Sequence, residues 1–458
     1  MKRAAFYCGG KAAVTKQKDL KSFARYVSLS ILGMLGMSCY ILADTFFISQ
    51  ALGPQGLTAL NLAIPIYSFV HGAGLMLGMG GSIKYAIAAG RGDRAAANRV
   101  FTRVLMLVGL FAAAFFTSGL FFSGPLSRLL GADEAVFGMT DIYLKVILLF
   151  SPAFMLNNVL ICFVRNDGAP RLSMMAMLGG SLSNILLDYM FMFPLGMGMF
   201  GAVLATGLAP VISLSILSPF LIKGKNSFQP IRASLSIRPV IGILSSGLPS
   251  LITELSAGIV MIAFNAIILR LQGNTGVAAY SIIANLSLVV MSMFTGIAQG
   301  VQPLLSRCHG RGETARVRNL LRLSLLAMAA LSILIYTAAL LLAGPIASVF
   351  NSQADTRLQS IAMRGLRLYF SACLFAGFNI ILSVYFTSIE RPRPAHIISL
   401  LRGFGLILPL AFLMAALFDM DGVWLAFPVT EAAVSLVSAG LLRRENPKNE
   451  TSVRQLSQ

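Results

Sequence analysis

Long apolar runs recur along the whole chain and are separated by short polar loops. A run of about 20 apolar residues is long enough to cross the hydrocarbon core of a bilayer as a helix. The sequence lacks the shorter segments of alternating polarity that are typical of a membrane β-barrel. The pattern therefore predicts an all-α polytopic membrane protein. Its twelve predicted spans are 23–49, 57–82, 101–122, 137–163, 170–193, 200–222, 240–270, 277–301, 320–342, 363–389, 395–416 and 422–442.

The loops between these runs alternate in composition. Loops such as 91-RGDRAAANRVFTR-103 and 307-RCHGRGETARVRNLLR-322 are rich in Lys and Arg, whereas loops such as 49-SQALGPQG-56 are poor in them. Short loops rich in Lys and Arg stay on the cytoplasmic side of a membrane. We therefore expect a multi-pass protein of a bacterial-type plasma membrane with both termini in the cytoplasm, which requires an even number of spans.

The chain also contains an internal repeat with an offset of 220 residues. The paired segments are 52-LGPQGLTAL-60 with 272-QGNTGVAAY-280, 88-AAGRGDRAA-96 with 308-CHGRGETAR-316, and 123-SGPL-126 with 343-AGPI-346. Repeats in one orientation are typical of transporters whose halves move around a central site. The predicted division is an N-terminal tail at 1–22, a six-helix bundle at 23–222, a linker at 223–239, a second six-helix bundle at 240–442 and a C-terminal tail at 443–458.

Composition narrows the class of function. The formal net charge is +19, but the basic residues lie between the spans, so membrane topology explains them better than nucleic-acid binding. The five cysteines form no CxxC pair and are interpreted as ordinary small apolar residues. No HExxH, GxSxG or Walker motif is present. We therefore expect neither an enzyme nor an ATP-driven pump, and no cofactor.

Acidic residues inside the predicted spans are the main candidates for function. They are Asp44, Asp188 and Glu254, with Glu431 as a fourth candidate. An ionisable side chain at the centre of a bilayer costs several kcal/mol. We place no Lys or Arg deep enough in a span to pair with these acids, which favours a role in binding cations.

Span 5 carries a polar face. Ser181, Asn184 and Asp188 are spaced by three and four residues, so they share one side of the helix. Thr206 in span 6 adds a hydroxyl. On span 1, Tyr40 lies one turn before Asp44. This set of oxygens suits either Na⁺ or a proton, and the alternative is a polar cluster that only holds helices together. No other metal site is expected.

Other polar residues within the spans are candidates for the wall of a substrate cavity. Asn157 and Asn158 lie in span 4, and Glu254 in span 7 has either a functional or an interfacial role. Asn265 follows Phe264, the counterpart of Asp44 at the repeat offset, so we expect ion coupling in the first half only. His71 in span 2 is interpreted either as a proton relay or as a hydrogen-bonded structural histidine.

Several short motifs, in this order and spacing, carry a family resemblance. They are 41-ILADTFF-47, 90-GRGD-93, 163-FVRNDGAPR-171, 184-NILLD-188 and 310-GRGE-313. Together they resemble the multidrug and toxic compound extrusion (MATE) family over roughly residues 20–440, most closely its multi-antimicrobial extrusion, MepA-like branch. The resemblance implies two six-helix bundles that form a V, alternating access, and export of organic cations in exchange for H⁺ or Na⁺.

The resemblance also implies roles for particular residues. The span 1 acid of the family corresponds to Asp44, its span 5 pair to Asn184 and Asp188, and the hydroxyl of its cation site to Thr206. The acid that some members carry in span 7 corresponds to Glu254. Some members place a cation-binding acid in span 10, but 369-YFSACLFAGFNIILSVYFTSI-389 contains none.

The sequence therefore predicts a multidrug efflux antiporter that exports cationic or amphipathic compounds in exchange for H⁺ or Na⁺. Its expected partners are small-molecule drugs, organic cations and the lipid bilayer, with no nucleic acid, and we expect a monomer. The alternative is a flippase for a lipid-linked or amphipathic precursor, whose central cavity should be positively charged. A channel or a scaffold without transport is a third interpretation.

Overall fold

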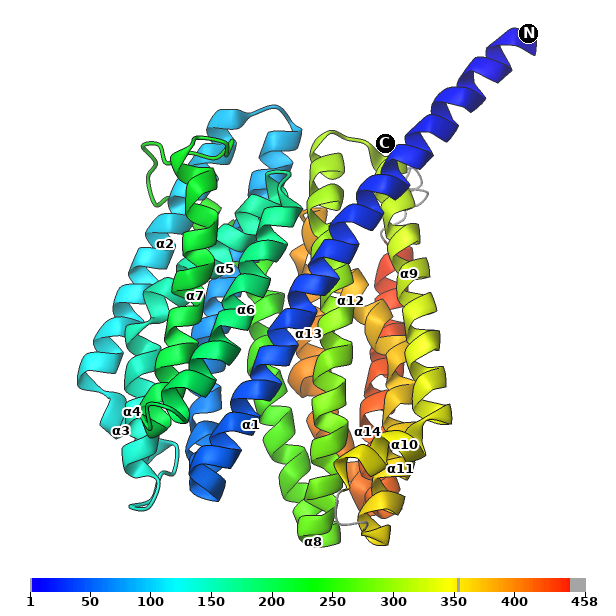
Figure 1. Ribbon diagram of the computed structural model, residues 1–458. Coiled ribbons are helices and arrows are strands. Elements are labelled where there is room, and N and C mark those ends of the chain that lie inside the picture. Colours follow the sequence, from blue (N-terminus) through cyan, green and yellow to red (C-terminus); the bar gives the residue numbers. More distant parts are fainter. Residues whose placement is uncertain (1, 352–354, 445–458) are drawn as a thin grey trace. The chain divides into compact units, whose positions relative to one another are not determined.

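The structure, a computed structural model, describes residues 2–351 and 355–444, so residues 445–458 of the predicted C-terminal tail lie outside it. Every regular element in these ranges is helical (Figure 1), which confirms the all-α class. The elements are α1 (Lys2–Gly90), α2 (Arg94–Phe121), α3 (Ser123–Leu129), α4 (Phe137–Leu149), α5 (Ser151–Asn166), α6 (Pro170–Met192), α7 (Gly198–Ile222), α8 (Ile237–Gly310), α9 (Thr314–Leu341), α10 (Ala343–Phe350), α11 (Thr356–Tyr369), the 3₁₀-helix η1 (Phe370–Ala372), α12 (Cys373–Ser388), α13 (Pro392–Leu400), the π-helix η2 (Leu401–Gly405) and α14 (Ile407–Arg444).

Bends explain how these helices contain twelve spans. In the described ranges, seven helices are long and apolar enough to cross a membrane, or eight if α4 and α5, bent by 50°, form one span. Non-helical backbone divides α1 at Gly53, α8 at Gly273, and α14 at Phe418 and Asp419. Each of these three segments therefore contains two predicted spans. Together with α6, which carries the polar face of span 5, they account for all twelve.

The internal repeat is visible in the backbone. Gly53 has φ 62° and ψ −154°, and Gly273 has φ 62° and ψ −155°. A positive φ is easy only for glycine, so both turns depend on the absence of a side chain. The helices that follow, α2 and α9, are each 28 residues long and begin 220 residues apart. Two copies of one folding pattern therefore make up the chain.

The chain forms two compact units. Unit 1 consists of Met1–Leu255 and Met291–Ser324, and unit 2 consists of Ser256–Val290 and Leu325–Gln458. Unit 1 therefore combines the first repeat with both ends of α8, whose first arm is residues 237–272 and whose second arm is residues 274–310. The predicted boundary at the 223–239 linker stays a prediction.

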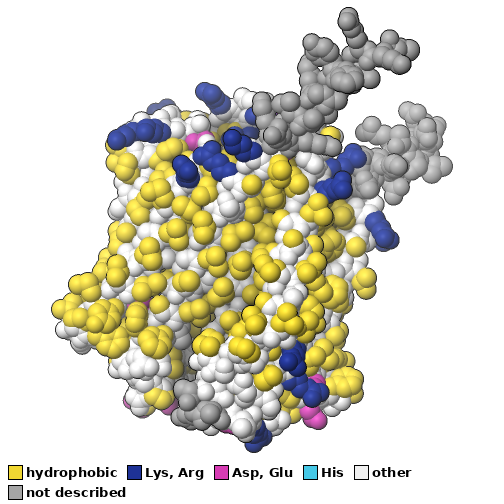
Figure 2. All heavy atoms as spheres, turned by 45° about the vertical axis from the view of Figure 1, so that its right-hand side comes forward, with side chains coloured by type: hydrophobic (Ala, Val, Ile, Leu, Met, Phe, Trp, Pro, Cys, Tyr) yellow, Lys and Arg dark blue, Asp and Glu magenta, His cyan; other side chains and the backbone are white. Residues whose placement is uncertain are grey.

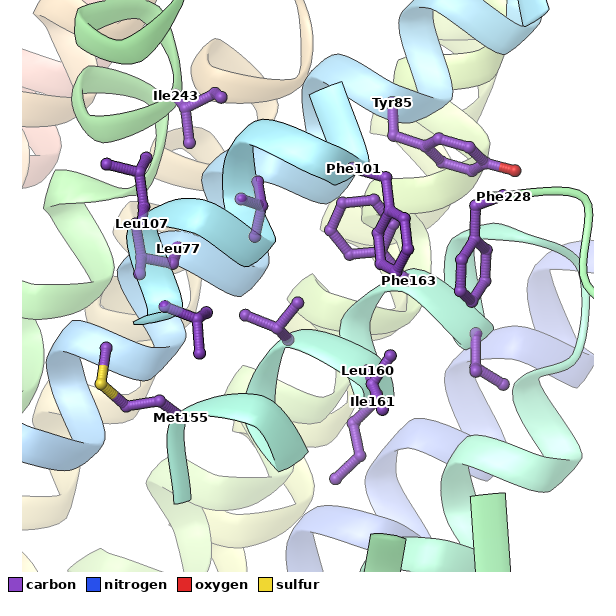
Figure 3. Close-up of a cluster of buried hydrophobic side chains, with 14 of the residues drawn as sticks. Leu77, Tyr85, Phe101, Leu107, Met155, Leu160, Ile161, Phe163, Phe228 and Ile243 are labelled. Atoms are coloured by element: carbon purple, nitrogen blue, oxygen red, sulfur yellow. The ribbon is translucent and has the colours of Figure 1, made fainter. Parts of the chain in front are cut away.

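The segment between α7 and α8 is anchored within unit 1. Phe228 is fully buried and packs against Phe101 and Phe163, with ring centroids 4.7 and 5.7 Å away (Figure 3). Backbone N–H groups nearby are also satisfied, since Ser227 N donates to Asp167 Oδ2 (2.7 Å). This linker is therefore part of the hydrophobic core of unit 1, and its apolar anchor is a single aromatic side chain.

Glycines allow α1 and α8 to approach closely. A Cβ atom at Gly247 would overlap the carbonyl oxygen of Met76, and one at Gly80 would overlap that of Ile243. Further along, a Cβ at Gly72 would lie 3.1 Å from Cβ of Glu254. The second arm of α1 and the first arm of α8 thus run antiparallel with their backbones almost touching.

The surface agrees with a membrane location. Hydrophobic side chains cover most of the face seen in Figure 2, while Lys and Arg gather mainly near its upper and lower edges. Exposed large apolar residues occur along many helices, including Leu110, Leu186 and Leu436 at 63%, 65% and 77% exposure. A soluble protein seldom exposes so much contiguous apolar surface, so these helices have the outer faces expected in a bilayer.

Candidate functional site

The candidate acid site of unit 1 is built by α1, α6 and α7. Asp44 on α1 is 8% exposed, Asp188 and Asn184 on α6 are fully buried, and Thr206 on α7 is 4% exposed. Leu186, on the opposite side of α6 from Asn184, is 65% exposed. The helical spacing thus turns the polar face of α6 inward, as the sequence predicts.

Asn184 connects the members of this site. In the amide orientation that satisfies both of its polar atoms, its nitrogen donates to Asp188 Oδ2 (3.1 Å) and its oxygen accepts from Thr206 N (3.2 Å). The Thr206 hydroxyl donates to the Ala202 carbonyl (3.1 Å) and lies 3.5 Å from the Asn184 amide. The asparagine therefore positions Asp188 against the backbone of α7.

Two carboxylate oxygens in the site stay unpaired. Oδ1 of Asp44 and Oδ1 of Asp188 are buried, and neither has a hydrogen-bond partner among the described residues. The two carboxylates are close enough to interact electrostatically. They repel each other when both are charged in a low-dielectric interior, and a buried oxygen without a partner costs free energy. A bound cation would relieve both penalties.

The donor set fits a hard monovalent cation or a proton. Sites for hard cations use carboxylate, amide and hydroxyl oxygens, and these are the groups that Asp44, Asp188, Asn184 and Thr206 present. The described residues hold no group of three or more His, Cys, Asp or Glu side chains arranged for a metal ion. Either Na⁺ or H⁺ can therefore use the two free carboxylate oxygens.

This site lies toward one end of unit 1. Asp44 precedes the Gly53 turn by nine residues, about 14 Å along the helix. Asp188 lies four residues before the end of α6. The turn from α6 into α7 is beside the Gly53 turn, since a Cβ at Gly198 would lie 3.8 Å from Leu52. We call this end, which contains Gly53 and Gly198, the turn end.

A second polar cluster lies deeper in the same unit. The Tyr40 and Tyr67 hydroxyls are hydrogen-bonded to each other at 3.0 Å. The Tyr67 ring stacks on His71, with centroids 5.9 Å apart and an interplanar angle of 9°. His71 Nδ1 lies 3.5 Å from Glu254 Oε2 on α8. The structure thus brings Glu254 and Tyr40 into one unit with the acid site.

The remaining candidates have different surroundings. Asn158 is buried and its Nδ2 donates to the His71 carbonyl oxygen (3.3 Å). Asn157 is half-buried, and its buried Oδ1 has no partner within the described ranges. Ser181 is 5% exposed on the inner face of α6. Asn265 is half-buried but belongs to unit 2, so the structure does not join it to the acid site.

One expectation about the intramembrane acids is wrong. Glu431 in unit 2 is 1% exposed and pairs with Arg402, whose Nη2 and Nε donate to Glu431 Oε1 at 2.7 and 2.8 Å. Asn379 Nδ2 also donates to Glu431 Oε2 (2.7 Å). Arg402 lies in the π-helix η2, inside predicted span 11, and a basic residue within that apolar run was the signal for this partner.

A basic residue assigned to a loop is also buried. Arg165 is 1% exposed near the end of α5, and its Nη1 donates to Gln299 Oε1 (2.9 Å). Its Nε has no partner within the described residues. Tyr67 is the other residue that the sequence did not single out. Its position one turn before His71 on the same face was the available signal.

The chain is similar to known transporters over most of its length. The family model described as MatE matches residues 30–190 and 249–413. The multidrug export protein MepA of Staphylococcus saprophyticus is 25% identical over 433 residues, which cover 92% of this chain and 93% of that protein. The FAD transporter of Shewanella oneidensis is 25% identical over 429 residues, which cover 91% of this chain and 92% of that protein.

Solved structures show the same fold. An outward-facing multidrug resistance MATE family transporter of the MOP superfamily superposes with a TM-score of 0.87 and 23% identity, over 93% of this chain and 96% of that chain. A MOP superfamily transporter from Pyrococcus furiosus superposes with a TM-score of 0.85 and 24% identity over the same shares. These similarities confirm the predicted MATE-like architecture.

Proposed function

Because the chain belongs to the MatE family of membrane transporters, we propose that it exports cationic or amphipathic small molecules in exchange for H⁺ or Na⁺. Export of several drugs is the activity in the name of the MepA relatives, which align over more than nine-tenths of this chain. We place the protein in a bacterial-type plasma membrane, as a monomer with both termini in the cytoplasm, because the loops rich in Lys and Arg alternate with loops poor in them.

The pair of free carboxylate oxygens in the acid site carries this proposal. Asp44 Oδ1 and Asp188 Oδ1 are buried and lack partners within the described ranges. When the coupling ion occupies the site, repulsion between the carboxylates falls. When it leaves, the negative charge attracts a cationic substrate. Exchange then requires only that ion and substrate compete for the same charge while unit 1 opens alternately to the two sides.

The direct test is ethidium transport in everted membrane vesicles that contain the protein. We expect ethidium to accumulate against its gradient when a pH or Na⁺ gradient is imposed, and not otherwise. Asp44→Asn should abolish this accumulation. Glu134→Gln, which removes an exposed carboxylate, should not. Normal transport by Asp44→Asn at a normal membrane level would contradict the proposal, and equilibration without accumulation would indicate a channel.

An anionic substrate is the second candidate, and it rests on the relative named as an FAD transporter. FAD carries negatively charged phosphates, whereas the free charges described in unit 1 near mid-span are carboxylates. The same vesicles, loaded with FAD, separate the two possibilities. Movement of FAD without movement of ethidium would replace the cation proposal.

A further inference from the structure

His71 and Glu254 form an intramembrane pair apart from the acid site. His71 is 6% exposed, and its Nδ1 lies 3.5 Å from Glu254 Oε2. The Tyr67 ring stacks on the imidazole, and Asn158 donates to the carbonyl oxygen of the same residue. The imidazole is therefore held in one place, with a carboxylate beside one of its nitrogens.

Close helix packing determines that these two side chains meet. The second arm of α1 and the first arm of α8 run antiparallel, and Gly247 allows the backbone of α8 to touch that of α1 at Met76. Glu254 lies seven residues after Gly247, two turns further on the same face of α8. It therefore faces Gly72 and His71 of α1.

The pair lies near the middle of the membrane. His71 is 18 residues past the Gly53 turn and 19 residues before the end of α1, about 27 Å from each. Glu254 is 17 residues past the start of α8 and 19 residues before its bend at Gly273. Asp44 is closer to the turn end, only nine residues from Gly53. The two clusters are thus at different depths.

We propose that His71 and Glu254 form a second proton-binding site, separate from Asp44 and Asp188. The inference rests on the proposed antiport function. With a neutral imidazole the pair carries the single negative charge of Glu254. With a protonated imidazole the pair is neutral overall. A charge at this depth is costly, so the pair carries charge only when a proton or a cationic substrate can compensate it.

Histidine makes this site specific for protons. It is the side chain whose charge changes between about pH 5 and 8 in water. An imidazole that is protonated beside a carboxylate repels Na⁺, while a neutral one leaves only one charged oxygen ligand. The site therefore exchanges a proton for a cationic substrate even if the acid site uses Na⁺.

The groups that face the pair come from four segments. They are Tyr67 on the second arm of α1, Tyr40 on its first arm, Asn158 on α5, and Tyr143 on α4, which lies within electrostatic reach of Tyr67. Lys84 of α1 is 13 residues from His71, about 20 Å along the helix. The charge of the pair is therefore determined mainly by its own two members.

Nitrogen-15 NMR of histidine tests the proton site without a substrate. The chain has three histidines, so the His71 signal of the full-length protein in detergent can be assigned by its absence in His71→Gln. We expect this signal to titrate between about pH 5 and 8 and its titration to change in Glu254→Gln. It should not change in Glu134→Gln. A His71 signal that does not titrate, or that is insensitive to Glu254, would overturn the proposal.

Proton release on ethidium binding tests the link to transport. We expect wild-type protein to release protons at pH 7, and His71→Gln and Glu254→Gln each to release fewer per bound ethidium than wild type. His396→Gln, in unit 2, is the matched control and should release as many as wild type. Full release by both His71→Gln and Glu254→Gln would refute the second site. Loss of ethidium transport in Asp44→Asn tests the antiport proposal separately.

Discussion

Asn166 and Gln302 exchange two hydrogen bonds inside unit 1. Asn166 Nδ2 donates to Gln302 Oε1 (3.0 Å), and Gln302 Nε2 donates to Asn166 Oδ1 (3.2 Å). Both side chains are almost completely buried. Arg307 Nη2 adds a hydrogen bond to the Asn166 carbonyl oxygen (3.0 Å). These contacts join the end of α5, in the first repeat, to the second arm of α8.

Replacing Gln302 by Leu should weaken this junction. The buried Asn166 amide loses both partners, which costs about 1–3 kcal/mol. We therefore expect a lower temperature of unfolding for the purified variant. If this end of unit 1 opens during transport, Cys162, which is buried one turn before Asn166, should also react faster with maleimide. A variant with the other four cysteines replaced by Ser isolates that reaction.

Gln55→Leu is the matched control, because Gln55 is exposed. It should change neither the unfolding temperature nor the labelling of Cys162. Equal labelling of Cys162 in wild type and Gln302→Leu would show that the junction does not control access to this end of unit 1.

The Arg402–Glu431 pair predicts a large stability effect in unit 2. Arg402→Met leaves the buried Glu431 carboxylate without its cation, and breaking a buried pair in this way costs about 3–5 kcal/mol. The double variant Arg402→Met with Glu431→Met should regain much of this loss. Thermal unfolding in detergent measures both effects.

Arg364→Met serves as the comparison for that pair. Arg364 pairs with Asp421, but its side chain is 68% exposed, and exposed pairs contribute about 0–1 kcal/mol. We expect little change in its unfolding temperature. Similar losses in Arg364→Met and Arg402→Met would mean that burial does not determine the strength of the inner pair.

Gly247→Ala should separate α8 from α1. The added methyl group overlaps the Met76 carbonyl oxygen, and forced overpacking costs about 1–3 kcal/mol or more. Loss of helix contact should also move Glu254 away from His71, which the histidine NMR titration would detect. Gly109→Ala is the control, since its Cβ would meet nothing within 4 Å. Unchanged stability in Gly247→Ala would contradict the close packing.

Phe228→Ala should release the linker between α7 and α8. Removing a buried aromatic ring costs about 3–5 kcal/mol, and the exposed Lys225 nearby should then be cleaved faster by trypsin. Leu235→Ala lies in the same linker, where Leu235 is 52% exposed, and should leave the cleavage rate unchanged. Equal rates in the two variants would show that Phe228 does not anchor the linker.

Local pattern was sufficient to predict much of the fold. Apolar runs, glycine positions and helical spacing act within one segment, so the twelve spans and the inward face of Asn184 and Asp188 could be predicted. The turn at Gly53 and its counterpart at Gly273 were predicted by the repeat. The 163-FVRNDGAPR-171 motif was recognisable by its letters, but its contacts were not. Asp167 accepts hydrogen bonds from Tyr85 Oη and from Ser227 N of the linker.

Partners that are distant in sequence could not be predicted. Glu431 was expected to lack a basic partner, yet Arg402 is 29 residues away in the chain and beside it in space. Arg165 was assigned to a loop because a charge next to an apolar run usually marks a boundary. Its burial depends on Gln299, 134 residues away.

The amino-acid sequence by itself therefore determined the membrane class, the repeat and the helix faces, because hydrophobic length and periodicity are local properties. The pairing of His71 with Glu254, of Asn166 with Gln302 and of Arg402 with Glu431 depended on how the helices pack. A polar side chain inside a membrane must find its partner across a helix interface, and the distance along the chain does not encode that interface.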